Sequence, residues 1–250
     1  MDIWSNKSIA RDLNDYVTVV KKYDQMYTFD IDKLLEVSRT ISDIDHCEID
    51  TIEIEFRLLK PIAKTVPQVN ALKINLQNAI STDPTKDISI EDPIKNYKFD
   101  MMIVGFIDDG SEPVINCWHL DCDRFYDADG QLVEVKGKQK YTHPLYHFQF
   151  GGGGMDGRHS GDILLLAAPR IPHPPMDIFL SIHFILKNFY SAKETSYSFL
   201  LDLYDDEDYK AIIHRAKQRM WFPYFDGLAS ADNHHQDFKL SKLFPLAEDS

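Results

Sequence analysis

Apolar residues recur at two spacings along the chain, and the change between them separates helical ends from a stranded middle. Over residues 9–20 and 32–41 they follow the three-to-four-residue spacing of a helix. Over residues 51–58 they alternate with polar residues, which predicts a strand with one buried face. Further strand candidates cover residues 99–107, 114–123, 131–136 and 143–150, whereas 72–80 fits either a strand or a short helix. The middle of the chain therefore predicts an antiparallel meander.

The longest apolar helix candidate lies in the last third of the chain. Pro172, Pro174 and Pro175 predict an extended approach to it, because proline restricts its own backbone and disfavours helix at the preceding residue. Over residues 176–189 apolar side chains cover almost the whole circumference of the helix, so we expect other elements to bury it. An amphipathic helix is predicted to begin near Asp205.

These patterns predict an α+β fold. We expect a central mixed or mostly antiparallel sheet of about five to seven strands, flanked by N-terminal and C-terminal helices. A parallel α/β arrangement is less consistent with the pattern, because the strands cluster instead of alternating with helices. Residues 1–250 are expected to form one domain, with a helical part at 1–45, a sheet core at 48–170, a helical part at 175–225 and a weakly ordered tail at 230–250.

Composition narrows the range of partners. The chain has 27 lysines and arginines against 40 aspartates and glutamates, a net charge of −13, so we expect no broad nucleic-acid surface. Three cysteines form no metal-binding or redox motif, and the first residues lack the pattern of a signal peptide. We therefore expect a cytoplasmic protein without a membrane segment, whose partner could be another protein.

Histidines and aspartates gather on two of the predicted strands. His119, Asp121 and Asp123 share one face of the strand at 114–123, and His143 and His147 share one face of the strand at 143–150. If these strands are neighbours with matching faces, the side chains converge, because cross-strand neighbours lie about 5 Å apart. The alternative is that they form the polar outer face of a sheet and carry no chemistry.

Two kinds of chemistry fit such a cluster. Asp121, Asp123, His143 and His147 are suitable ligands for a divalent metal such as zinc, manganese or iron. The same residues with His119 suit a metal-free phosphodiesterase, in which one imidazole takes a proton and another donates one. The identity of any cofactor stays open at this point.

A second motif lies between these strands. Glu134 and Lys136 are separated by one residue and follow Asp121 and Asp123. This arrangement resembles the acidic-x-lysine element of restriction-endonuclease-like nucleases, and the resemblance implies magnesium held by an aspartate and Glu134, with Lys136 orienting the nucleophile. It covers only about sixteen residues, and a loop and a strand follow Lys136 where that fold usually has a helix.

Arg170 and His173 form a last candidate site at the proline-rich entry to the apolar helix, where a phosphate or carboxylate could bind. Two functions remain open. The first is a non-catalytic binding or assembly module. The alternative is a hydrolase, either a nuclease or a phosphodiesterase, that uses the His/Asp cluster.

Overall fold

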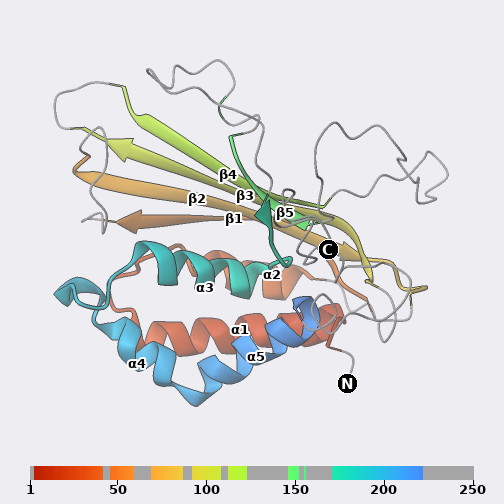
Figure 1. Ribbon diagram of the computed structural model, residues 1–250. Helices are drawn as coiled ribbons and strands as arrows, with labels where there is room; N and C mark the ends of the chain where they lie inside the picture. Colours follow the sequence, from red (N-terminus) through yellow and green to blue (C-terminus); the bar gives the residue numbers. More distant parts are fainter. Residues whose placement is uncertain are drawn as a thin grey trace, which may run out of the picture.

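The computed structural model describes residues 3–41, 46–58, 69–86, 92–107, 112–122, 146–151, 155 and 171–221. Within these residues the chain forms a six-stranded antiparallel sheet, and the helices from both ends of the chain pack on one side of it (Figure 1). The predicted α+β class is confirmed. No helix in the described residues is long and apolar enough to cross a membrane.

The order of the strands in the sheet follows the order of the chain, and every neighbouring pair is antiparallel. Residues 72–80, whose sequence pattern fitted either a strand or a short helix, form a strand. This strand pairs along nearly its whole length with both neighbours. The strands are β1 (Glu48–Leu58), β2 (Ala71–Thr82), β3 (Ile94–Phe106), β4 (Val114–Cys122), β5 (Tyr146–Phe150) and β6 (Ile171–Pro172). The predicted strand at 131–136 lies outside the described residues.

Two helices come from the N-terminal part and three from the C-terminal part of the described chain. They are α1 (Asn6–Tyr23), α2 (Asp32–Thr40), α3 (Ile178–Phe189), α4 (Phe199–Asp205) and α5 (Glu207–Met220). Residues 199–205, for which the sequence pattern predicted no helix, form α4. The next helix begins at Glu207, two residues after the predicted start, because Asp206 accepts hydrogen bonds from the backbone N–H groups of Asp208 and Tyr209.

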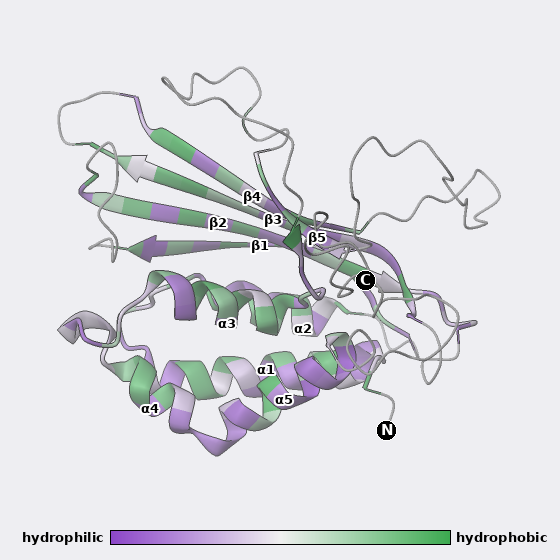
Figure 2. Ribbon diagram, in the orientation of Figure 1, coloured by the Kyte–Doolittle hydropathy of each residue, from purple (hydrophilic) through white to green (hydrophobic). Residues whose placement is uncertain are grey.

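Hydrophobic burial explains the layered arrangement. The alternating apolar residues of β1 are buried in a core that continues through the helices. Figure 2 shows α3 as mostly hydrophobic and α5 as mostly hydrophilic. This difference matches their positions, because α3 contacts both β2 and α5 while α5 lies further from the sheet (Figure 1). Each large apolar side chain removed from water contributes about 1.5–3 kcal/mol to folding.

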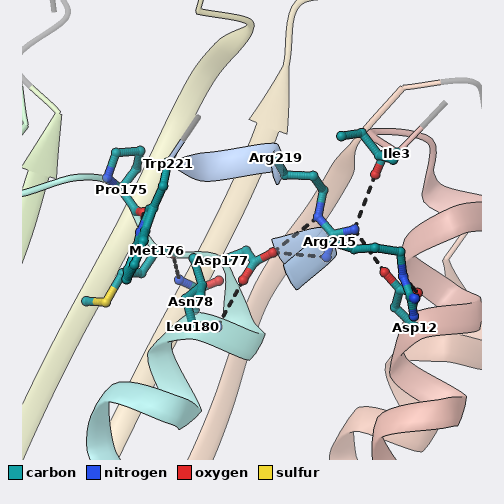
Figure 3. Close-up of polar contacts among 10 residues, drawn as sticks. All are labelled: Ile3, Asp12, Asn78, Pro175, Met176, Asp177, Leu180, Arg215, Arg219 and Trp221. Atoms are coloured by element: carbon teal, nitrogen blue, oxygen red, sulfur yellow. Dashed lines mark hydrogen bonds and ion pairs between the residues drawn. The ribbon is translucent and has the colours of Figure 1, made fainter. Parts of the chain in front are cut away.

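A buried charge network joins α1, α3 and α5 (Figure 3). Arg219, whose side chain is 1% exposed, donates to Asp12 over 2.9 Å and to Asp177 over 3.2 Å. Arg215 reaches the other oxygen of Asp12 at 2.8 Å, so two cations face two carboxylates. Asp177 also caps α3 by accepting from the N–H of Leu180. The network therefore fixes how α1, α3 and α5 pack against one another.

Candidate functional site

Strands β4 and β5 are neighbours, as the convergence of the histidines and aspartates required. Asp121 lies opposite His147, and His119 lies opposite Gln149. The structure therefore brings His119, Asp121 and His147 together on one face of the sheet. Asp123 and His143, which were expected in the same cluster, lie outside the described residues.

The carboxylate of Asp121 lies between the two imidazoles. Its Oδ2 is 3.1 Å from Nε2 of His119 and 3.8 Å from Nε2 of His147. The side chain of Asp121 is 50% exposed, whereas those of His119 and His147 are 13% and 2% exposed. The other ring nitrogen of His119, Nδ1, is 3.3 Å from the carbonyl oxygen of Gly151.

Both ring nitrogens of His119 thus face oxygen acceptors that belong to the protein. A neutral imidazole can donate from only one nitrogen, so this geometry favours the imidazolium, which donates from both. The hydrogen bond with Asp121 raises the pKa of His119, against the opposing effect of burial and with help from the charge of Asp100. In the described structure both ring N–H groups of the imidazolium are therefore directed at oxygen atoms of the protein.

The interpretation of the histidine face as an exposed polar surface is wrong for β5. His147 is 1% exposed and Gln149 is 9% exposed, although Tyr146 and Phe148 on the opposite face of the strand are also buried. Sequence alternation alone does not predict this, since a strand covered on both faces can carry polar side chains on one of them. Within the described part of the chain, no three histidine, cysteine, aspartate or glutamate side chains are arranged to hold a metal ion.

The remaining predicted site residues divide into two groups. Glu134, Lys136 and Arg170 lie outside the described residues, so the endonuclease-like pair stays a prediction. His173 is described, and its Nδ1 lies 2.7 Å from the carbonyl oxygen of Pro174. Its ring packs against Phe148 and Phe184, and burial lowers its pKa. An imidazole that is neutral and surrounded by aromatic rings is a weak anion ligand.

A second candidate site lies on the helical side of the molecule. Residues of helices α3, α4 and α5 line an open hollow of about 410 Å³, which we call the helical hollow. Its lining is basic and aromatic: His183, Lys187, Tyr204, Tyr209, Lys210, Ile213, His214 and Lys217.

The lysines of the helical hollow differ in how their charge is balanced. Lys210 is paired with Asp205 and Glu207, each at 2.9 Å. Among the described residues, neither Lys187 nor Lys217 has a carboxylate partner. Their ammonium groups lie instead over aromatic rings, 3.6 Å from the centre of the Tyr204 ring and 5.3 Å from the centre of the Trp221 ring.

Three aromatic side chains form one wall of the helical hollow. The rings of His183, Tyr204 and Tyr209 lie within 5.6 to 5.9 Å of one another. Burial, together with the positive charges of Lys187 and Lys217, lowers the pKa of His183 to about 4. His183 is therefore neutral at pH 7. Its Nδ1 lies 2.8 Å from the Tyr209 hydroxyl, so the two side chains share one hydrogen bond.

The sequence analysis did not predict the helical hollow. One signal was readable: Lys210, His214 and Lys217 are spaced by four and three residues, and so are on one face of α5. His183 and Lys187 are spaced by four residues on α3. Only the packing of α3 against α5 shows that the two basic faces meet.

No protein-family model, curated protein or solved structure matches this chain. The function is therefore argued from the geometry and charge of the described residues.

Proposed function

We propose that the protein is a non-catalytic binding module and that an anionic ligand binds in the helical hollow. The observation that carries this proposal is the pair Lys187 and Lys217. Both side chains line one hollow, and neither ammonium group has a carboxylate partner within the described residues.

The unbalanced charge is unusual in this chain. With 40 acidic against 27 basic residues, a lysine side chain on this surface has an excess of carboxylates available as partners. Lys210, in the same hollow, is paired with two of them. Cations that stay unpaired in a concavity produce a local positive potential, and the low-dielectric walls strengthen it. An anion that entered would pair with Lys187, whose pKa burial lowers in its absence.

The described part of the β4–β5 cluster supports a non-catalytic role. The protons on His119 are directed at oxygen atoms of the protein, and His147 is buried. Proton transfer to a substrate would require these contacts to break first.

Calorimetric titration of inorganic pyrophosphate at low ionic strength tests the proposal. We expect binding by the wild type and at least tenfold weaker binding by Lys187→Gln and by Lys217→Gln, since a hydrogen bond between charged groups contributes about 1.5–3 kcal/mol. Lys193→Gln is the matched control, because Lys193 is exposed and is not part of the hollow lining. Equal binding by the wild type and the Lys187→Gln/Lys217→Gln double variant, or no binding at all, would contradict the proposal.

A second candidate function is the histidine–aspartate hydrolase. One observation favours it: a half-exposed carboxylate lies between two imidazoles. This candidate predicts hydrolysis of bis(4-nitrophenyl) phosphate that falls by about a hundredfold or more in His147→Gln, which is the usual contribution of one acid–base group. Activity at the level of buffer, or activity unchanged in both His147→Gln and Asp121→Asn, would remove the described cluster as its site.

A further inference from the structure

We infer that the ligand of the helical hollow is a nucleotide-sized molecule that combines one phosphate group with a planar ring. This inference rests on the proposed function and adds the size and the chemical class of the ligand. Three features of the hollow lead to it: its volume, the charges around it and its aromatic wall.

The volume indicates a small molecule. Binding sites for small ligands measure about 300–1,000 Å³, and the helical hollow, at about 410 Å³, is near the lower end of that range. Helices α3, α4 and α5 all contribute to its lining, so a ligand that filled it would contact all three.

The surrounding charges disfavour a polymer. Asp205 and Glu207 are exposed next to Lys210, at the junction of α4 and α5. A nucleic acid held by its backbone needs several neutralised phosphates, and each contributes to affinity through counterion release. Here the hollow offers only two unpaired ammonium groups, and its third lysine is already paired with these carboxylates, in a chain of net charge −13. A single phosphate group can pair with Lys187 and Lys217 without passing the acidic side chains, which an extended polymer backbone would have to do.

The aromatic wall is suited to the rest of such a ligand. The rings of His183 and Tyr204 are half-buried and provide apolar surface and edges for an offset or edge-to-face contact with a planar base, and the buried ring of Tyr209 packs against both. One polar group among them has no partner: the hydroxyl oxygen of Tyr204 is buried and makes no hydrogen bond in the described part of the chain. A buried hydroxyl without a partner is costly, so a ligand whose binding shifted the surrounding side chains and placed a sugar or base oxygen next to it would gain that hydrogen bond.

Titrations with the full chain at one fixed ionic strength test the inference. The probes are the four ribonucleoside monophosphates, inorganic phosphate, adenosine and a single-stranded oligonucleotide. We expect at least one monophosphate to bind tenfold or more tightly than inorganic phosphate. Lys187→Gln should weaken both, whereas Tyr204→Leu should weaken the nucleotide alone. Tyr204→Phe keeps the ring and removes only the hydroxyl, so a loss of nucleotide affinity in this variant measures the contribution of the hydroxyl. The variant also keeps the test valid if Tyr204→Leu misfolds.

The possible results separate the inference from the proposed function. If inorganic phosphate and all four nucleotides bind equally and depend on Lys187, the anion site stands and the inference is wrong. If the oligonucleotide binds more tightly than every monophosphate, the inference is also wrong, and the ligand is a polymer. If no probe binds, both the inference and the proposed function fail.

Discussion

His119 and His183 are both partly buried histidines, but their surroundings shift their pKa values in opposite directions. The side chain of His119 meets a carboxylate, and the hydrogen bond to it outweighs the cost of burial. His183 meets two lysines and a tyrosine hydroxyl, so burial and like charge both favour its neutral form. The same residue type is thus shifted toward its charged form in one place and toward its neutral form in the other, for reasons that lie in its partners.

The lowered pKa of His183 predicts loss of stability in acid. Between pH 6.5 and about 4 the unfolded chain binds a proton at this residue that the folded chain does not bind. The free energy of unfolding should therefore fall with pH across this window, by up to about 3 kcal/mol, since one pKa unit corresponds to about 1.4 kcal/mol. Urea unfolding of the wild type and of His183→Gln from pH 7 to pH 4 measures it.

Among the described residues, the ionisable groups that contact His183 or shift its pKa are Lys187, Lys217, Tyr204 and Tyr209, and lysine and tyrosine ordinarily titrate well above this window. The raised pKa of His119 has the opposite sign, because its stabilisation is present at low pH and is lost as pH rises through the folded pKa. The difference between wild type and variant isolates His183. Identical pH profiles for the two proteins would show that His183 does not cause the loss.

At the scale of the elements, the start of α3 depends on one side chain with two roles. Asp177 accepts from the N–H of Leu180 over 3.0 Å, and it also faces the buried Arg219. Burial raises the pKa of Asp177, and the positive charge of Arg219 opposes the rise. Asn78 joins the same region to the sheet, because its amide donates to the carbonyl oxygen of Met176 over 3.0 Å. The helix, the sheet and the charge network therefore meet at this turn (Figure 3).

Two substitutions separate the roles of Asp177. Asp177→Asn keeps a capping oxygen but removes the charge, and we expect it to cost about 3 kcal/mol, as for breaking a buried ion pair. Asp177→Ala removes the cap as well, and should cost about 1 kcal/mol more. Urea unfolding at pH 7 gives both values. A cost for Asp177→Asn as small as for a surface substitution, under about 0.5 kcal/mol, would mean that Asp12 alone balances Arg219.

The elements also show how far hydrophobic patterning predicts structure. Residues 51–58 alternate cleanly, and they form β1 because one face of that strand packs on helices while the other does not. Residues 72–80 were ambiguous, and pairing with β1 and β3 decided in favour of a strand. Residues 199–205 form a helix too short to show its period above the background, so α4 was missed.

At the scale of the whole molecule, one hydrophobic cluster contains side chains from all the described helices and from β1 to β5. The charge network adds contacts between α1, near the start of the chain, and α5, near the end of the described part. Segments that share a core in this way are expected to unfold together. The arrangement is consistent with the expectation of a single domain, which remains a prediction.

Cooperative unfolding tests that expectation. The three tryptophans are well separated in the chain: Trp4 precedes α1, Trp118 is on β4 and Trp221 follows α5. We expect unfolding curves from tryptophan fluorescence and from far-ultraviolet circular dichroism to coincide, with one midpoint in urea. Variants that keep one tryptophan each, with phenylalanine at the other two positions, report the parts separately. Fluorescence midpoints that differ between these variants by more than the effect of the tryptophan substitutions on stability would indicate more than one folding unit.

The sequence by itself determined the α+β class, the antiparallel meander and most of the helix and strand positions, because these depend on local periodicity and on proline and capping residues. It also placed His119, Asp121 and His147 on faces that could meet. Tertiary structure decided which of these side chains are buried, since burial depends on what covers a face and not on its alternation. It also brought together the residues of the helical hollow and those of the charge network. Lys187 on α3 and Lys217 on α5 line the same hollow, and Asp12 meets Arg219, only because helix packing brings distant segments together.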